Sequence, residues 1–174
     1  MAMTRQIRFL GDPALREPAA PVERFDAALA ALVEDLIATM YAADGIGLAA
    51  PQIAEGVRVA VIDVGDRRDG SEVVTLVNPR IVRRAGTVAS EEGCLSIPGL
   101  VETIERAAEV DVEYVDPSGE PGLVSGTDLL GRALQHEIDH LDGILFIDHL
   151  TPLRRSAALS EWRERLAAAE HPDG

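Results

Sequence analysis

The feature that most constrains this chain is the segment Gln135–His140 (QHEIDH), which places two imidazoles four residues apart. Residues at i and i+4 share one face of a helix, so His136 and His140 can bind a single metal ion. Glu137 directly follows the first histidine, where its carboxylate could take a proton from water at the metal. The segment therefore predicts a helix that carries the metal site of a hydrolytic enzyme.

The single cysteine, Cys94, is the candidate for a third ligand. It lies in the segment 91–99 (EEGCLSIPG), which we interpret as a loop whose glycine lets the backbone approach a ligand closely. One thiolate and two imidazoles leave a tetrahedral ion with one open position, as in catalytic sites. A closed structural site would need a fourth ligand, and the sequence has no second cysteine.

Length and composition fit one soluble globular domain. The 174 residues, of which 47% are apolar, can bury a substantial core. A net charge of −14 disfavours nucleic acid and anionic membranes as partners. We see neither the apolar run of a signal peptide nor a membrane span of roughly 20 apolar residues. We therefore expect a cytoplasmic single domain over residues 1–174, compact from about 4 to 166, with a frayed tail at 167–174.

Three helices are predicted, besides a short helical turn at Asp12-Pro13. The first begins at Asp26, carries an apolar stripe, and ends near Gly45, a glycine that could adopt the left-handed cap conformation. The second begins at Thr127 or Asp128, carries both histidines and ends at Gly143. The third covers about 152–169 and is amphipathic.

Alternating, β-branched segments predict strands at 57–64, 73–77 and 110–115, and the turn signal at 116–119 closes a hairpin. Short loops rather than helices separate these strands, which favours antiparallel or mixed sheets. We therefore expect an α+β fold in which the sheets pack around the central metal-binding helix, with further helices at the two ends of the chain.

The segment Gly45–Gln52 (GIGLAAPQ) has two interpretations. Spacing alone favours a helix cap followed by an apolar connector. Alternatively, its backbone forms one wall of a narrow cleft and Gln52 offers an amide donor. It is no phosphate loop, because it lacks the Gly-Lys-Ser/Thr sequence of such loops.

Three segments together resemble the signature motifs of bacterial peptide deformylases: Gly45–Gln52, Glu92–Ser96 (EGCLS) and Gln135–His140. They occur in the family's order and at similar separations, and the resemblance extends from about Thr4 to Leu166. Motifs of this length are more specific than the His-Glu-x-x-His pattern, which many metalloproteases share.

The resemblance implies removal of the formyl group from N-formylmethionine at the start of nascent polypeptides. It also implies one divalent metal ion, typically Fe2+, with zinc, nickel or cobalt as substitutes. The matching metal ligands are Cys94, His136 and His140. Glu137 matches the general acid/base, and the oxyanion donors match the Gln52 side chain and the Leu95 N–H. The wall along which the peptide would pair as an added strand matches Gly45, Ile46 and Gly47.

Two regions depart from the family pattern. Glu105 replaces a proline found in many relatives, and together with Val101 it bears on the shape and charge of the pocket rim. Some deformylases are described as docking on the ribosome through a basic C-terminal helix. The corresponding helix here carries four arginines, Arg154, Arg155, Arg163 and Arg165. The chain then ends in Glu170–Gly174, which is not basic, so a transient ribosome contact stays an open alternative.

Other polar residues are predicted to be structural. Arg106 is most simply an ion-pair partner, for example of Glu92, and His149 and His171 are solvent-facing or structural. We expect a monomer that acts on formylmethionyl nascent peptides. Two alternatives to this function remain. A metallopeptidase would make the first two motifs coincidental, and an idle metal-binding or ribosome-associated module would have no need of Glu137.

Overall fold

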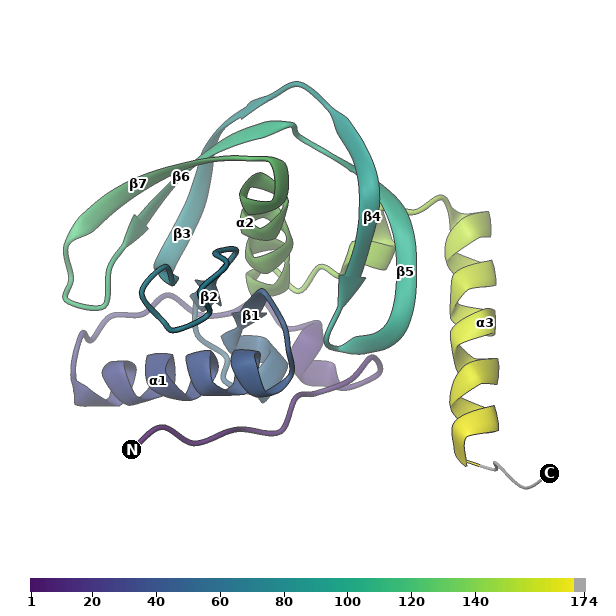
Figure 1. Ribbon diagram of the computed structural model, residues 1–174, viewed down its shortest axis with the longest axis horizontal. Coiled ribbons are helices and arrows are strands. Elements are labelled where there is room, and N and C mark those ends of the chain that lie inside the picture. Colours follow the sequence, from purple (N-terminus) through teal and green to yellow (C-terminus); the bar gives the residue numbers. More distant parts are fainter. Residues whose placement is uncertain (171–174) are drawn as a thin grey trace.

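Helix α2 (Asp128–Leu141) stands at the centre of the fold in the computed structural model, which describes residues 1–170 (Figure 1). A five-stranded sheet lies on one side of it and a long two-stranded hairpin on the other. Helix α1 (Ala27–Ala42) runs beneath the sheet, and helix α3 (Pro152–Glu170) lies outside the hairpin. This arrangement confirms the α+β class and the central position of the histidine-bearing helix.

All strand pairs in both sheets are antiparallel. The larger sheet has the order β1-β2-β3-β6-β7. Its strands are β1 (Gly47–Ala49), β2 (Val59–Ile62), β3 (Val74–Ala85), β6 (Glu109–Val115) and β7 (Pro121–Thr127). The predicted strands correspond to β2, the first part of β3, and β6. Short connections between these strands produce the antiparallel topology that the sequence indicated.

The segment around Cys94 was predicted to be a loop, and this prediction was wrong. It belongs to a hairpin of β4 (Val88–Cys94) and β5 (Ile97–Arg106), with Cys94 at the end of β4. Buried and exposed residues largely alternate along β5, but its buried positions include Glu102 and Arg106. Buried charges hid the two-residue period of this strand, since a hydrophobic alternation is the usual sign of a half-buried strand.

Helix α1 begins as predicted, because the Asp26 carboxylate accepts hydrogen bonds from the N–H groups of Ala28 and Leu29. Its end differs from the prediction. The left-handed residue is Asp44, with φ 55°, and not Gly45. Aspartate tolerates this conformation because its short polar side chain can hydrogen-bond locally. A left-handed cap therefore does not explain the glycine at position 45.

The short helical turns and the C-terminal helix complete the fold. The 3-10 turns are η1 (Pro13–Leu15), η2 (Ala50–Ile53) and η3 (Phe146–His149). Trp162 anchors α3 to the hairpin by donating a hydrogen bond to the Pro98 carbonyl at 3.0 Å. Helix α3 extends to Glu170, so the first part of the predicted tail is helical, while residues 171–174 lie outside the described chain. No helix within residues 1–170 has both the length and the apolar character of a membrane span.

The buried apolar side chains form separate clusters, two of which bear on the position of α2. One cluster, which includes Leu134 and Ile138, packs α2 against the larger sheet. Another includes Ile97, Leu100 and Phe146 and joins the hairpin to η3 and α3. The His136 ring of α2 stacks on Phe146 of the second cluster, with ring centroids 6.2 Å apart, so both clusters help to position the helix that carries the histidines.

Helix α2 approaches β7 closely at two glycines. A Cβ atom on Gly131 would lie 2.8 Å from the carbonyl oxygen of Gly126, a backbone atom that cannot move aside. We expect Gly131→Ala to destabilise the protein by roughly 1–3 kcal/mol, because overpacking outweighs the better helix propensity of alanine. Urea unfolding would measure the change. Gly56→Ala is the matched control, since its Cβ would meet no atom within 4 Å; equal stabilities of the two variants would contradict the prediction.

Candidate metal centre and active site

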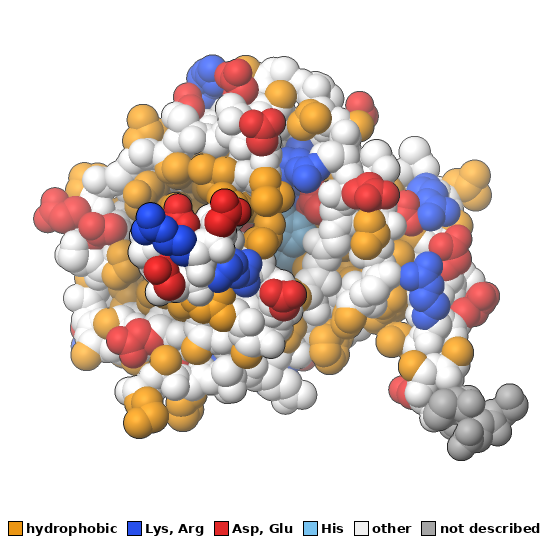
Figure 2. All heavy atoms as spheres, in the orientation of Figure 1, with side chains coloured by type: hydrophobic (Ala, Val, Ile, Leu, Met, Phe, Trp, Pro, Cys, Tyr) orange, Lys and Arg blue, Asp and Glu red, His pale blue; other side chains and the backbone are white. Residues whose placement is uncertain are grey.

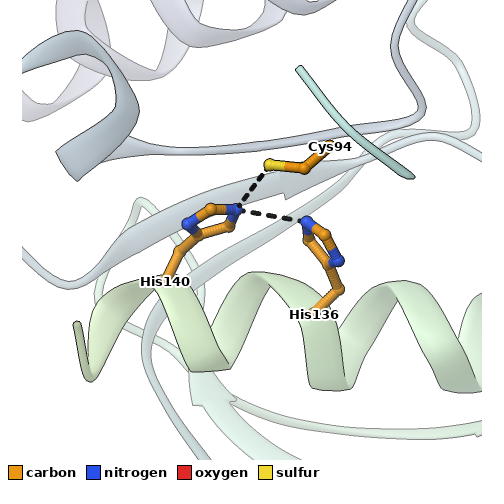
Figure 3. Close-up of side chains that lie close together, drawn as sticks. All are labelled: Cys94, His136 and His140. Carbon is orange, nitrogen blue, oxygen red and sulfur yellow. Dashed lines mark hydrogen bonds between the residues drawn. The ribbon is translucent and has the colours of Figure 1, made fainter. Parts of the chain in front are cut away.

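Three side chains converge on one point between α2 and the tip of the hairpin (Figure 3). Single ligand atoms of Cys94, His136 and His140 lie within 4.8 Å of one another. The Cys94 Sγ is 3.3 Å from the His140 Nε2, which is 3.1 Å from the His136 Nε2. Burial lowers the pKa of His140 well below its ordinary value, which favours the neutral imidazole that binds a metal. The donor set therefore fits a single metal ion.

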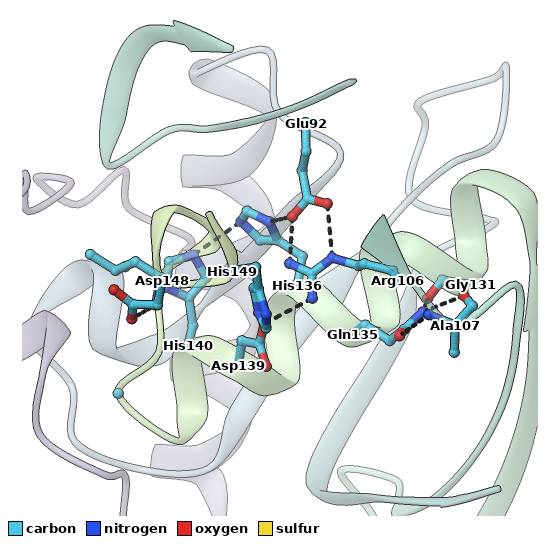
Figure 4. A network of polar contacts seen from close by, with 12 residues as sticks. Glu92, Arg106, Ala107, Gly131, Gln135, His136, Asp139, His140, Asp148 and His149 are labelled. Atoms are coloured by element: carbon cyan, nitrogen blue, oxygen red, sulfur yellow. Dashed lines mark hydrogen bonds and ion pairs between the residues drawn. The ribbon is translucent and has the colours of Figure 1, made fainter. Parts of the chain in front are cut away.

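A buried carboxylate orients the first histidine (Figure 4). The Nδ1 atom of His136 lies 2.5 Å from the Glu92 Oε1, so Nδ1 donates to the carboxylate and Nε2 is the ring nitrogen that faces His140 and Cys94. Arg106 binds both Glu92 oxygens, at 2.8 and 2.5 Å, which confirms the predicted ion pair. It also binds Asp139 at 2.8 Å, and Asp139 lies 2.8 Å from the His149 Nε2. His149 is therefore a structural member of this network, as one of its two predicted roles required.

The network perturbs the acidity of Glu92. Burial would raise the pKa of this carboxyl, but hydrogen bonds from Arg106 and His136 and their positive charges lower the pKa to about 2. The carboxylate is therefore charged at any physiological pH and always available to His136.

Glu137 lies beside the ligands in a different environment. Its side chain is buried, its Oε2 contacts no hydrogen-bond donor within the described chain, and burial raises its pKa to about 7. The carboxylate is packed against Gly47 of β1, where an added Cβ would lie 2.9 Å from the Glu137 Cδ and closer still to its Oε1. Glycine at position 47 therefore makes room for Glu137, and the carboxyl can exchange a proton near neutral pH.

Gln52 is fixed beside the cysteine. Its Oε1 accepts a hydrogen bond from the Ala49 N–H at 2.9 Å, and its Nε2 donates to the Ser96 Oγ at 3.0 Å. These bonds direct Nε2 toward the Cys94 Sγ, 3.7 Å away. Ser96 was not predicted to orient a site residue, although it lies only two residues after the cysteine. A side chain that orients another side chain leaves no spacing signal of its own.

A cleft of about 520 Å³ opens onto these residues, and a histidine is visible at the bottom of the hollow in Figure 2. One wall is the chain before and within β1, and the other is the hairpin. The predicted residues that line it are Gly45, Ile46, Gly47, Gln52, Cys94, Leu95, His136 and Glu137. His140 is buried beneath them, with an exposed fraction of 1%. Val101 lines the rim as expected, whereas Glu105 is exposed on β5 and does not line the cleft.

Gly45 narrows this cleft. An added Cβ at Gly45 would lie 2.6 Å from the Leu95 Cδ1, so a larger residue would push the two walls apart. The interpretation of Gly45–Gln52 as a cleft wall is therefore the correct one, and the simple cap-and-connector interpretation was wrong. Only glycine permits so close an approach of backbone to a side chain.

The fold and the site together define an α+β protein in which three side chains that could bind one metal ion converge beside a buried glutamate. The family model for polypeptide deformylases matches residues 4–156. The chain belongs to this family, whose members are hydrolases that act on N-formyl peptides.

Individual relatives agree with this assignment. The peptide deformylase of Acidobacterium capsulatum is 45% identical over 97% of this chain and 99% of its own length. A crystal structure of a peptide deformylase from Legionella pneumophila, 46% identical, superposes with a TM-score of 0.89 over 95% of this chain and 98% of that one. The enzyme from Synechococcus elongatus in complex with actinonin, 40% identical, covers 92% of this chain and 90% of its own, with a TM-score of 0.86.

Gly47→Ala tests the contact between β1 and Glu137. We expect kcat/KM for a formylated peptide to fall about 100-fold, because the added methyl group displaces the carboxylate while leaving Cys94 and the histidines untouched. A formate-release assay gives the rate, and metal analysis checks that the ligands still bind. Gly56→Ala serves as the control, and wild-type activity in Gly47→Ala would refute the proposed contact.

The low pKa of Glu92 predicts a loss of stability in acid. The folded-state pKa of about 2 lies below the ordinary value of 4.5. The ion pair therefore stabilises the protein above about pH 5, and this contribution, on the order of 3 kcal/mol, is lost as the pH falls toward 2. The free energy of unfolding of Glu92→Gln, measured in urea, should depend less on pH between about pH 5 and pH 2 than that of the wild type. The exposed neighbour variant Glu91→Gln should behave like the wild type; an unchanged acid dependence in Glu92→Gln would contradict the assignment.

Proposed function

We propose that this chain hydrolyses the N-formyl group of formylmethionyl nascent peptides, releasing formate, with Glu137 as the general acid/base. The observation that carries the proposal is the position of this buried carboxyl. It packs against Gly47 and lines the cleft together with Cys94 and His136, two of the three converging side chains. A site that only bound metal would need the ligands but not a base beside them.

We further propose that Cys94, His136 and His140 hold one divalent ion, with Fe2+ as the expected metal and zinc, nickel or cobalt as possible substitutes. When bound, the ion would supply Lewis-acid chemistry that lowers the pKa of water and polarises a carbonyl group. The thiolate and the two neutral imidazoles are ligands suited to these metals.

Glu137 would move the proton that hydrolysis requires. Its carboxylate accepts a proton from the attacking water and delivers it to the amine that leaves as the formamide bond breaks. A pKa of about 7 suits both steps, because the group is then neither too weak a base nor too weak an acid at neutral pH.

Two donors are proposed to stabilise the oxygen that becomes negatively charged. The Gln52 Nε2 is directed into the site by its bonds to Ser96 and Ala49, and Leu95 lies directly after the cysteine at the cleft. Donors of this kind each contribute about 3 kcal/mol to transition-state stabilisation. The Leu95 N–H and the Gln52 amide would act together on this oxygen.

The peptide itself would lie along Gly45, Ile46 and Gly47 as an added strand. Within residues 1–170, strand β1 is an edge of the larger sheet and β4 pairs with β5 alone, so two strand edges border the cleft. The close contact between Gly45 and Leu95 leaves little width. A formyl carbon, which carries a hydrogen in place of a side chain, fits such a cleft, whereas an internal peptide bond is excluded.

A monomeric state, a cytoplasmic location and a transient ribosome contact all stay predictions. Arg154 and Arg165 of the C-terminal helix have partners within the fold: Arg154 forms an ion pair with the buried Glu102, and Arg165 donates to the Gly99 carbonyl at 2.8 Å. These bonds support a structural role for Arg154 and Arg165, two of the arginines that a ribosome contact would use.

Glu137→Gln tests the proposed mechanism. The amide keeps the shape of the side chain but cannot accept a proton, so we expect formate release from formyl-Met-Ala-Ser to fall by roughly 10²–10⁴-fold with metal content unchanged. Anaerobic purification with metal analysis provides the comparison with the wild type. Unchanged activity would refute the role of Glu137, and appreciable internal cleavage of unformylated peptides by the wild type would refute the proposed specificity.

A further inference from the structure

The loop between β2 and β3, residues 63–73, carries an arginine that contacts the cleft wall from behind. The Arg68 Nη2 donates a hydrogen bond to the Gly45 carbonyl oxygen at 2.6 Å. Its guanidinium carbon also lies 5.1 Å from the centre of the Tyr41 ring, within the range of a cation–π contact. In Figure 2, the surface at the place of this loop shows arginine and acidic side chains beside the hollow that contains the histidine.

Arg68 binds the cleft wall just before the point where its backbone pairing with β2 begins. Strand β1 pairs with β2 from Gly47 onward, and the Asp63 N–H donates to the Ile46 carbonyl at 2.8 Å. The Gly45 carbonyl is the next acceptor along the wall. It receives its donor from the side chain of Arg68 instead of from the sheet. A charge-assisted hydrogen bond of this kind is stronger than a neutral one, so it can fix a segment that the sheet does not.

Tyr41, whose ring contacts the Arg68 guanidinium, is itself fixed by a buried carboxylate. The Tyr41 hydroxyl donates a hydrogen bond to Asp63, which is buried with an exposed fraction of 1%. The second oxygen of Asp63 accepts from the Gly65 N–H at 2.9 Å and fixes the base of the loop. By contrast, Arg67 is exposed and forms no ion pair with residues 1–170. Two adjacent arginines thus differ completely in their contacts.

Gly45 is therefore held between two side chains. Arg68 binds its carbonyl oxygen, and Leu95 of the opposite wall packs against the position where a Cβ would stand. The position of Gly45 helps to set the width of the cleft, because the Leu95 side chain of the other wall fills the place where a Cβ of residue 45 would stand.

We propose that Arg68 is a positioning residue for the substrate: it fixes the Gly45–Gly47 wall along which a formylated peptide lies. This inference rests on the proposed function. Without the arginine, the wall loses its anchor beyond the sheet and the peptide loses a preorganised edge. The loss affects the bound substrate and the transition state alike, so it raises KM and leaves kcat nearly unchanged.

The test compares Arg68→Ala, Arg68→Lys and the matched control Arg67→Ala in the metal-loaded enzyme. For formyl-Met-Ala-Ser we expect Arg68→Ala to raise KM about tenfold, with kcat within about twofold of the wild type. Arg68→Lys should recover part of the loss, because an ammonium group can still donate to a carbonyl. Formyl-Met amide has no residue after methionine to lie along the wall, so its KM should change less in Arg68→Ala. Arg67→Ala should match the wild type for both substrates.

Other results would overturn the inference. An unchanged KM in Arg68→Ala, with or without a lower melting temperature, would leave Arg68 a merely structural residue. A fall in kcat alone, or an equal effect of Arg67→Ala, would also contradict positioning of the wall. These failures differ from a failure of the proposed function, in which the wild type itself would release no formate from formyl-Met-Ala-Ser.

Discussion

The rest of the site depends on the hydrogen bonds that the buried Glu92 carboxylate accepts. It accepts hydrogen bonds from His136 on α2 and from Arg106 on β5, while Arg106 also reaches Asp139 on α2. The carboxylate thus ties the hairpin to the helix by charged groups within a protein interior, where such bonds are strong when fully paired and costly when broken. It fixes the distance between the strand that carries Cys94 and the helix that carries both histidines.

The parts of the site that the sequence predicts are those with a local period or a unique residue. His136 and His140 follow from helical spacing, and Cys94 follows because the chain has one cysteine. The hairpin that positions Cys94 was missed, since β5 buries Glu102 and Arg106 where a strand usually buries apolar residues. The pairing of Arg106 with Glu92 was nevertheless predicted, as the simplest role for this arginine.

Glycines show a different limit of sequence reasoning. Gly45 was expected to cap a helix, but Asp44 adopts the left-handed conformation instead. Gly45 and Gly47 are required by side chains that lie far away along the chain, Leu95 and Glu137. A glycine needed for a tertiary contact has the same appearance in a sequence as one needed for a turn, so only the fold distinguishes the two. The same holds for Arg68, whose partners come from α1 and from the wall of the cleft.

The division of the ligands between two elements has a consequence for the folded state. The sulfur lies at the end of β4, and the ring nitrogen of His140 belongs to α2, 46 residues later in the chain. An ion shared by these atoms would act as a reversible cross-link, and the free energy of coordination would become part of the free energy of folding. The ion would then add to the tether that Glu92 and Arg106 already provide, so the same atom that supplies the chemistry would also help to keep one wall of the cleft in register with the other.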